Sequence, residues 1–420
     1  MIAIFDIGKT NKKCFVFDED YRIVYEKSVH LPETADEDGD PCEDLPLLQN
    51  WIWDSFLEIL RDRRFSIDAV NFTTYGASLV FLDVQQEPCL PLYNYLKPFP
   101  ENLESQFFKD YGVKEKMSLE TASPVLGSLN SGLQLYRIKH LKPETFAVIK
   151  HALHLPQFVA SLISGAYFSD ITSIGCHTML WNFEQNNYHE WTKKEEVVSK
   201  LAPIRESDST VQISLQLSDR RHNMEVGVGL HDSSSALIPY LASFEEPFVL
   251  ISTGTWNITL HPFNDVPLTP DELAQDCLCY LSYRGKPVKA SRLFAGHLHE
   301  QGVQKIAADF GVADDFFQSG QLVETPGLLD KYRELVQQLV EKQVVSTKLV
   351  LYGSPVRRIF VDGGFSQNDI FMQLLAASFP EMEVFAAEIP QATAIGAALA
   401  IHRHWNSKPV AEHLIRLNPY

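Results

Sequence analysis

Three short segments of this 420-residue chain combine glycine, hydroxyl and acidic residues in a way that suits phosphate chemistry. The first is Asp6-Ile7-Gly8-Lys9-Thr10-Asn11, which follows an apolar run at 2–5. A tight turn here could present backbone N–H groups and the Thr10 hydroxyl to a phosphate. Asp6 could hold Mg²⁺ through water, because Mg²⁺ keeps several of its waters when proteins bind it. The alternative is an ordinary hairpin in which Asp6 only forms the turn.

This first segment is not a Walker A loop, although it contains Gly8-Lys9-Thr10. Ala3 stands where that motif has its first glycine. Residues 11–17 also predict a strand, whereas a Walker A loop leads into a helix.

The second segment is Thr253-Gly254-Thr255-Trp256, which follows an apolar strand at 248–252. Two such turns from two domains could hold one polyphosphate from both sides, although each alone is also an ordinary hairpin. The third is 362–368, in which Gly363 and Gly364 lie between a predicted strand and a helix. Glycines there let a flat ring or a phosphate approach the backbone, and the alternative is a tight strand–helix turn.

A candidate general base lies in Gly229-Leu230-His231-Asp232, where a glycine-rich turn precedes a predicted helix. The helix dipole favours the ionised form of a carboxylate at this end. An ionised carboxylate that is hydrogen-bonded to an alcohol can accept its proton. The alternative is that Asp232 or Ser233 is only the N-cap of the helix. The glycines do not complete G-x-G-x-x-G, which disfavours a Rossmann dinucleotide site.

Composition excludes several classes of protein. The 36 basic and 54 acidic residues give a net charge of −18, which repels nucleic acids and anionic membranes. The six cysteines form no CxxC pair, and the histidines match no zincin motif, so we predict free thiols, no structural metal and a cytoplasmic location. No apolar run approaches the ~18 residues of a membrane span.

The elements that must position these segments alternate between strands and helices, which predicts an α/β fold. In the first half we predict strands near 2–5, 14–17, 22–29 and 67–72, helices at 47–63 and 144–165, and an acidic surface loop at 33–43. In the second half we predict strands at 248–252, 257–260 and 359–362, and helices after 231 and at 328–343 and 369–378. Gly8 and Gly254 occupy equivalent strand–turn–strand units. Duplicated domains facing one cleft are one interpretation, and chance similarity is the other.

The order of these motifs resembles the FGGY carbohydrate kinases, which belong to the actin/Hsp70/hexokinase ATPase superfamily. The resemblance rests on Asp-Ile-Gly-Lys-Thr-Asn, Gly-Leu-His-Asp, Ser-Thr-Gly-Thr-Trp and Asp-Gly-Gly-Phe-Ser-Gln-Asn, in that order. Residues 168–170 and 180–183, and the segment Gln391-Ala392-Thr393-Ala394-Ile395-Gly396, also resemble segments of that family. The resemblance implies an α/β fold of two ribonuclease-H-like, actin-like ATPase domains with an interdomain active-site cleft. Residues 1–230 would form the sugar-binding domain, and residues 231–420 would form the nucleotide-binding domain.

The family phosphorylates a sugar or polyol hydroxyl with MgATP, so the resemblance implies a role for each motif. Asp232 would be the catalytic base, Asp6 would hold Mg²⁺, and the sugar would contact Tyr75, Gly76, Ala77, Tyr93, His231 and Asp232. The nucleotide would contact Gly8, Thr10, Asn11, Gly254, Thr255, Gly363, Gly364 and Asn368.

The Ser-Thr-Gly-Thr-Trp sequence and the segment 292–296 resemble the rhamnulokinase and fuculokinase branch, which acts on O1 of 6-deoxyketoses such as L-rhamnulose and L-fuculose. Tyr93 and Tyr95 would provide an aromatic wall for such a sugar. Lys9 and Gln391 depart from the family's usual residues. A kinase for xylulose, ribulose or glycerol, or a non-kinase ATPase like actin or Hsp70, are the alternatives. The expected partners are ATP and a small sugar, with no nucleic acid or membrane, and the chain could be a monomer or a homodimer.

Overall fold

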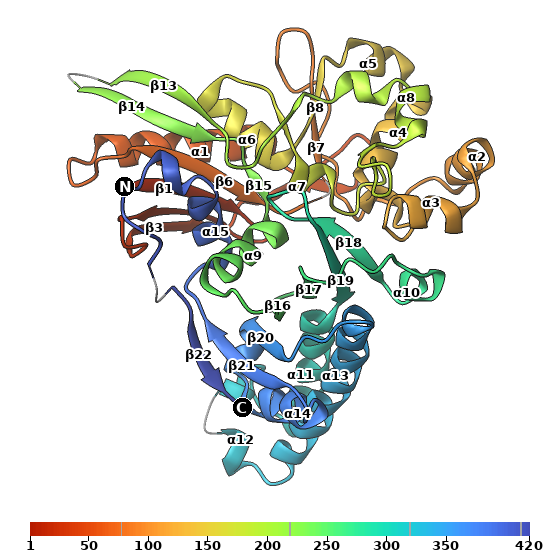
Figure 1. Ribbon diagram of the computed structural model, residues 1–420, viewed down its shortest axis with the longest axis vertical. Coiled ribbons are helices and arrows are strands. Elements are labelled where there is room, and N and C mark those ends of the chain that lie inside the picture. Colours follow the sequence, from red (N-terminus) through yellow and green to blue (C-terminus); the bar gives the residue numbers. More distant parts are fainter. Residues whose placement is uncertain (77, 218–219, 319–320, 412–413) are drawn as a thin grey trace.

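The structure is a computed structural model that describes residues 1–76, 78–217, 220–318, 321–411 and 414–420. Two seven-stranded mixed sheets dominate it (Figure 1). The first sheet comes from the N-terminal half, and its strands lie in the order β13 (Thr210–Leu217), β14 (Arg220–Gly227), β6 (Ala69–Thr74), β1 (Ile2–Ile7), β2 (Lys12–Phe17) and β3 (Ile23–Val29), with β15 (Leu230–His231) also paired to β6.

The second sheet comes from the C-terminal half. Its strands lie in the order β18 (Cys277–Leu281), β19 (Pro287–Leu293), β17 (Asn257–His261), β16 (Val249–Thr253), β20 (Arg358–Gly363), β21 (Glu383–Glu388) and β22 (Arg416–Pro419).

The two sheets repeat one connectivity. In the first, β1 pairs antiparallel with β2, β2 pairs antiparallel with β3, and β6 returns parallel to β1. In the second, β16, β17 and β19 form the same antiparallel series, and β20 returns parallel to β16. The strand–turn–strand units around Gly8 and Gly254 therefore occupy equivalent places, which favours the interpretation of duplicated domains over chance similarity. The architecture is the two-sheet α/β arrangement of an actin-like ATPase.

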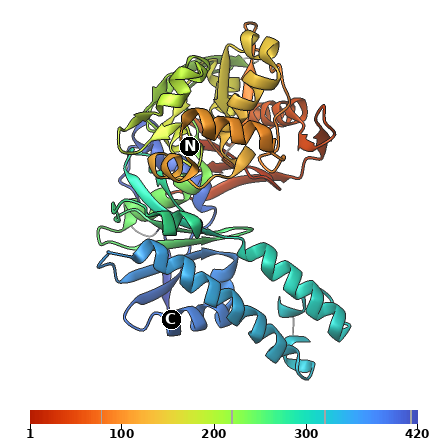
Figure 2. The same cartoon turned by 90° about the vertical axis from the view of Figure 1, so that its right-hand side faces the viewer.

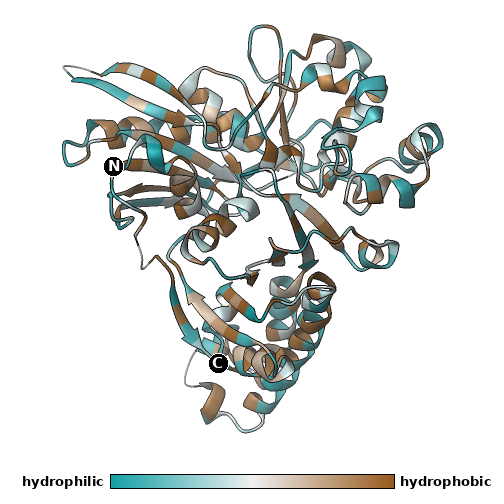
Figure 3. Ribbon diagram, viewed as in Figure 1, coloured by the Kyte–Doolittle hydropathy of each residue, from teal (hydrophilic) through white to brown (hydrophobic). Residues whose placement is uncertain are grey.

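Burial explains which strands are central. All six residues of β6 and five of the six in β1 are buried, because helices cover both faces of the sheet. The hairpin of β13 and β14 projects from the molecule (Figure 3). In β13 exposed and half-buried residues alternate. Central strands of both sheets are strongly apolar in the same view.

Helices complete two layered bodies, which Figure 2 shows one above the other. One face of the first sheet packs on α1 (Leu45–Arg61) and α6 (Leu155–Ser164). The outer face of the second packs on α11 (Ala295–Phe310), α13 (Leu328–Leu351) and α14 (Asp369–Ser378), of which α11 and α13 lie side by side (Figure 2).

Two helices fill the space between the sheets. Helix α9 (Asp232–Ser243) places Leu237 and Tyr240 in the core of the second sheet. Helix α15 (Ala392–Ala400) comes from the end of the chain and packs on the first sheet. A Cβ at Gly396 would lie 1.9 Å from the carbonyl oxygen of Ser235, so only glycine permits this approach of the two helices.

The remaining elements include those of a second hydrophobic core beside the first sheet and several short hairpins and helices. They are β4 (Glu33–Ala35), β5 (Pro41–Glu43), β7 (Leu79–Leu82), α2 (Glu101–Tyr111), α3 (Lys114–Glu120), α4 (Ser131–Leu141), α5 (Pro143–Val148), β8 (His151–His154), β9 (Ser169–Asp170), α7 (Ile171–Ile174), β10 (Trp181–Asn182), β11 (Asn187–Tyr188), α8 (Glu190–Lys194), β12 (Ile204–Arg205), α10 (Pro270–Ala274) and α12 (Gln321–Glu324).

Three local predictions were wrong. The single helix at 144–165 is two helices separated by β8, which pairs with β7. The acidic loop at 33–43 is a hairpin of β4 and β5. Asp232 is the first residue of α9 and His231 is its N-cap. In the described part of the chain, no helix has the length and apolar content that crossing a membrane requires.

Candidate active site

The turn between β1 and β2 is tight. The N–H of Gly8 donates to the carbonyl of Asn11 at 2.9 Å, and a Cβ at Gly8 would lie 3.0 Å from that oxygen. Thr10 and Asn11 are exposed, so their polar groups are accessible to a ligand. Lys9 is already paired, because its Nζ lies 2.5 Å from a carboxylate oxygen of Glu33.

Asp6 lies just before this turn, and the C-terminal part of the chain reaches it. Its carboxylate accepts a hydrogen bond of 2.5 Å from Thr393 Oγ1 at the start of α15. Burial and, to a smaller extent, the negative charge of Asp232 raise the pKa of Asp6 to about 6, although the Thr393 hydrogen bond and the Lys13 ammonium act in the opposite direction. Lys13 also donates to the side chain of Gln391 at 3.1 Å. The two halves of the chain therefore meet at Asp6.

The equivalent turn between β16 and β17 is closed by a hydrogen bond of 3.0 Å from the Gly254 N–H to the Trp256 carbonyl. Gly254 and Thr255 are exposed. The N-terminus of α11 lies against this turn, because a Cβ at Gly296 would come within 2.2 Å of the Gly254 oxygen. Small residues on both sides thus leave backbone groups of the turn accessible.

The Gly363-Gly364 turn follows β20, and its two glycines have different environments. Gly363 has φ +76°, and a Cβ there would lie 1.8 Å from the carbonyl oxygen of Thr253. It therefore packs against the end of β16. A Cβ at Gly364 would meet no atom within 4 Å. Gly364, rather than Gly363, is the glycine beside open space.

A cavity of about 650 Å³ lies next to this turn. Gly254, Gly364 and Asn368 line it together with His299, Phe317, Tyr332 and Phe365. Asn368 caps α14 by accepting the Phe371 N–H at 3.1 Å, and its amide donates to the Tyr332 hydroxyl at 2.7 Å. Aromatic walls with a few fixed polar groups are typical of a pocket for a flat heterocycle. Three of the residues predicted to bind nucleotide therefore share one pocket.

Asp232 opens α9 with its carboxylate held by the next residue. Its Oδ1 accepts the backbone N–H of Ser233 at 2.6 Å, and the same oxygen lies 3.3 Å from His231 Nε2. Desolvation raises the pKa of Asp232 to about 6, and the hydrogen bonds to Ser233 act in the opposite direction. The side chain still has 32% of its surface exposed, so a small molecule can reach it. At neutral pH this carboxylate is ionised yet more basic than an ordinary aspartate.

His231 and Gly76 form one contact beside Asp232. A Cβ at Gly76 would lie 2.5 Å from His231 Nε2, so a side chain at this position would displace the imidazole. Burial lowers the pKa of His231 to about 4, which keeps the ring neutral. Tyr75 is buried, and its hydroxyl donates to Glu43 at 3.1 Å. Ala77 lies outside the described residues.

The two candidate wall residues Tyr93 and Tyr95 lie in different surroundings. Tyr93 is 1% exposed, and its hydroxyl donates to Glu37 at 2.5 Å. The ring of Tyr95 lies 6.0 Å from that of Tyr75, and its pKa is raised by burial and then by the charge of Asp232. Tyr95 therefore lies nearer to the candidate base than Tyr93 does, although Tyr93 was the residue predicted to contact the sugar.

Sequence reasoning missed the residues that hold these groups in place. Thr393 was noted only as part of a terminal motif, yet its hydroxyl binds Asp6. Thr172 accepts the backbone N–H of His231 at 3.0 Å and donates to the buried carboxylate of Asp170. Thr393 and Asp170 lie in segments recognised as similar to the family, whereas Thr172 does not, and only the fold shows which side chains these threonines support.

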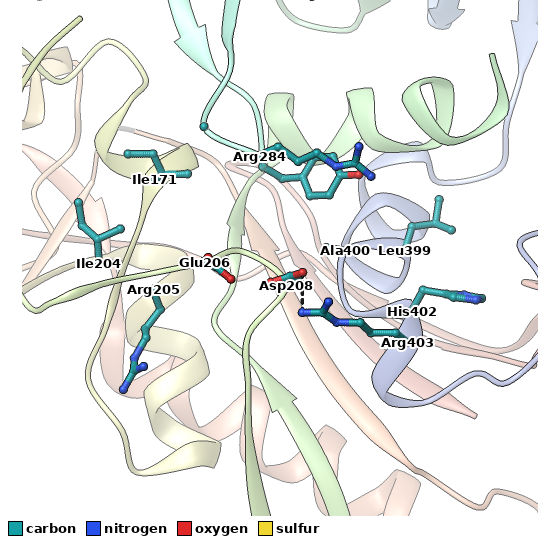
Figure 4. A pocket seen from close by; sticks show the side chains of 12 residues that line it. Ile171, Ile204, Arg205, Glu206, Asp208, Arg284, Leu399, Ala400, His402 and Arg403 are labelled. Atoms are coloured by element: carbon teal, nitrogen blue, oxygen red, sulfur yellow. Dashed lines mark ion pairs between the residues drawn. The ribbon is translucent and has the colours of Figure 1, made fainter. Parts of the chain in front are cut away.

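Another cavity, of about 640 Å³, lies where segment 204–208, the Tyr283–Gly285 turn and the end of α15 meet (Figure 4). Its arginines do not converge on one point. Arg403 is paired with Asp208 at 2.8 Å, and Arg205 points away from Arg284. This cavity thus lacks a cradle for an anion, and the candidate active site remains the region of Asp6 and Asp232.

Comparison with protein families gives two matches. Residues 1–238 match the model of the FGGY family of carbohydrate kinases, N-terminal domain. Residues 326–404 match the model of the C-terminal domain of the same family.

Individual relatives are distant. A rhamnulokinase of Halalkalibacterium halodurans is 21% identical over 271 residues, which cover 60% of this chain and 54% of the relative. The chain thus matches about half the length of that curated relative.

Solved structures resemble the chain over nearly its whole length. A carbohydrate kinase from Novosphingobium aromaticivorans has a TM-score of 0.78 at 22% identity, covering 99% of this chain and 95% of that one. A ligand-bound xylulose kinase from Lactobacillus acidophilus has a TM-score of 0.78 at 15% identity, covering 100% and 93%. At these identities the likeness shows the fold.

Proposed function

The chain belongs to the FGGY family of carbohydrate kinases, and from this premise we propose that it transfers the γ-phosphoryl group of MgATP to a hydroxyl of a ketose sugar. In this proposal residues 1–230 bind the sugar and residues 231–420 bind the nucleotide. Helix α15 of the second segment packs on the first sheet and so connects the two bodies.

One observation carries the proposal, namely the closeness of Asp232 to Asp6. Thr393 donates to Asp6, and its carbonyl accepts the Ser235 hydroxyl at 2.8 Å, in the first turn of the helix that Asp232 begins. Two carboxylates with pKa values near 6 are both ionised at neutral pH. Asp232 can then accept the proton of a sugar hydroxyl, and it is pre-oriented for this by the Ser233 N–H and His231. A hydrolytic ATPase would not require such a base beside aromatic walls.

The residues present fit a divalent cation at Asp6. Burial disfavours the charge of Asp6, and the Lys13 ammonium offsets this only in part, because the pKa of Asp6 remains raised to about 6. A hydrated Mg²⁺ would supply the missing positive charge and neutralise the phosphate oxygens during transfer. The Thr393 hydrogen bond goes to one oxygen of this carboxylate and orients it.

Backbone groups supply the remaining phosphate contacts. The turns at Gly8–Asn11 and Gly254–Thr255 would hold the phosphates, and the cavity beside Gly364 and Asn368 would hold adenosine. This division explains how a chain with net charge −18 could bind ATP without a basic surface.

For the acceptor we favour O1 of a 6-deoxyketose such as L-rhamnulose or L-fuculose. The rhamnulokinase relative and the partly exposed ring of Tyr95 support this choice. An apolar wall suits the methyl group of a deoxy sugar. A pentulose or polyol is the second candidate, because similar folds include xylulose and glycerol kinases.

A coupled ADP-release assay tests the function directly. Purified protein is mixed with MgATP and, in turn, L-rhamnulose, L-fuculose, D-xylulose, D-ribulose and glycerol. We expect ADP release to require one of these acceptors, with a 6-deoxyketose giving the highest kcat/KM. ADP release that no acceptor stimulates would favour a non-kinase ATPase instead.

A further inference from the structure

The hairpin of β4 and β5, residues 33–43, contains six acidic residues, and we call it the acidic hairpin. Its tip is folded around Asp36, whose Oδ1 accepts the N–H groups of Asp38 and Asp40 at 2.9 and 3.1 Å. A segment so acidic, in a protein already strongly negative, needs local cations to stay compact.

Lys97 supplies one such cation. Its Nζ lies 2.6 Å from Asp36, 2.9 Å from Asp38 and 2.6 Å from Asp40, and its side chain is only 5% exposed. Among the described residues these aspartates are the one group of three acidic or metal-binding side chains with the spacing of a metal site. The Lys97 ammonium lies among these three aspartates. The acidic hairpin therefore fixes the position of the chain segment that contains Lys97.

The acidic hairpin makes a second contact with this segment at Tyr93, four residues before Lys97. Glu37 accepts the Tyr93 hydroxyl at 2.5 Å and also pairs with Lys142. The guanidinium of Arg137 lies over the Tyr93 ring at 4.5 Å. The buried Tyr93 is therefore an anchor and not a surface that a sugar could reach.

Tyr95 lies between these two anchors. Tyr93 and Lys97 are buried, whereas Tyr95 is partly exposed, with its ring 6.0 Å from that of Tyr75. The charges that raise its pKa, after burial itself, are those of Asp232 and Glu33. The segment thus presents one aromatic ring toward the candidate base while its neighbours are held by the hairpin.

The two ends of the acidic hairpin, Glu33 and Glu43, also contact residues of the candidate active site. Glu33 pairs with Lys9 in the first phosphate turn at 2.5 Å. Glu43 pairs with the buried Lys12 at 2.7 Å and accepts the Tyr75 hydroxyl. One short hairpin is therefore connected to the phosphate turn, to Tyr75 and to both anchors of Tyr95.

We propose that the acidic hairpin is a brace that fixes Tyr95 against the acceptor sugar, with Lys97 as the positioning residue. This inference rests on the proposed kinase function for its catalytic consequence. The physical argument is that an aromatic wall on an irregular segment contributes to binding only if its position is set before the sugar arrives. The three aspartates around the Lys97 ammonium fix the segment on one side of Tyr95, and Glu37 fixes it on the other side through Tyr93.

The test compares Lys97→Met with Lys27→Met, which breaks an exposed pair of equal 2.6 Å length with Glu58. With the best acceptor of the wild-type enzyme, we expect Lys97→Met to raise the acceptor KM at least about tenfold, the cost of one lost ligand contact. The KM for ATP should stay unchanged, and Lys27→Met should leave both constants unchanged. Asp38→Asn, which removes only an exposed carboxylate, should shift the acceptor KM in the same direction by less.

A double-variant cycle identifies Tyr95 as the residue through which Lys97 acts. Tyr95→Ala should raise the acceptor KM, and adding Lys97→Met should have little further effect. The inference would be overturned if the increases in acceptor KM from the two substitutions multiply in the double variant, or if Lys97→Met leaves the acceptor KM unchanged.

Hydrogen–deuterium exchange of segment 92–98 separates this inference from the function itself. The amide of Lys97 donates to the Asn94 carbonyl at 3.0 Å, so it should exchange slowly in the wild type and faster in Lys97→Met. Equal exchange in both proteins would refute the brace even if the kinase is active. Faster exchange would support the brace even if no acceptor stimulates ADP release.

Discussion

Replacement of Asp232 by asparagine tests the proposed chemistry most directly. Asparagine keeps the shape of the side chain and its hydrogen bond from the Ser233 N–H, but it cannot accept a proton. The contacts that fold α9 should therefore survive. A change in rate would report the loss of the base and not a local collapse.

The expected loss in kcat follows from the role of a general base, which contributes about 10²- to 10⁴-fold. Because the pKa of Asp232 is about 6, roughly 97% of the wild-type carboxylate is ionised at pH 7.5. Wild-type kcat/KM should fall as the pH drops below 6, and this dependence on Asp232 should be absent from the variant. ATP binding, monitored by the nucleotide-induced rise in Tm, should be retained.

The same substitution should stabilise the protein. Raising the pKa from 3.8 to about 6 means that the folded state disfavours the charge by at most about 3 kcal/mol above pH 6. Since 32% of the side chain is exposed, solvent screening reduces this to about 1–2 kcal/mol. Below pH 4 the carboxyl is protonated in both states, so the gain should vanish there.

Two measurements decide the outcome. Acceptor-stimulated ADP release gives kcat, and urea unfolding at pH 7.5 and pH 3.5 gives the free energy of unfolding. Turnover near that of the wild type would refute the assignment of Asp232 as the base. Loss of stability at pH 7.5 would refute the view that burial makes its charge unfavourable.

Other substitutions test the surrounding structure. Gly364→Val should fill space beside the nucleotide cavity and weaken ATP binding by about 1–3 kcal/mol, and an unchanged nucleotide-induced Tm shift would contradict the placement of adenosine. Thr393→Val removes the donor that lowers the pKa of Asp6, so the acidic fall in rate should move to higher pH, and an identical pH–rate profile would argue against this role. Gly396→Ala should force α15 away from Ser235 and cost about 1–3 kcal/mol in urea unfolding, with no loss expected if the helices can separate freely.

Much of the fold was determined by local sequence patterns. Apolar runs that end in Asp6 and Thr253 predict buried strands followed by tight turns, because small and acidic residues favour turns over strand continuation. The pattern from Asp369 to Ser378 predicts a helix with the observed bounds. Such signals are local, so they could be recognised without knowing what each element packs against.

Side-chain partners far apart in the sequence could not be predicted in this way. Thr393 reaches Asp6 across 387 positions, and Lys97 reaches Asp36 across 61. The strand at 151–154 was predicted as helix, because its apolar residues suit either element until β7 pairs with it.

The sequence alone determined which residues could do chemistry, since residue type and position in a turn or at a helix start are local properties. Only the tertiary structure decided which of them meet. It brought Asp6 and Asp232 together by packing α9 and α15 between the two sheets. It separated Tyr93 from Tyr95 and turned an acidic segment into a brace, because such contacts depend on long-range packing that no local pattern contains.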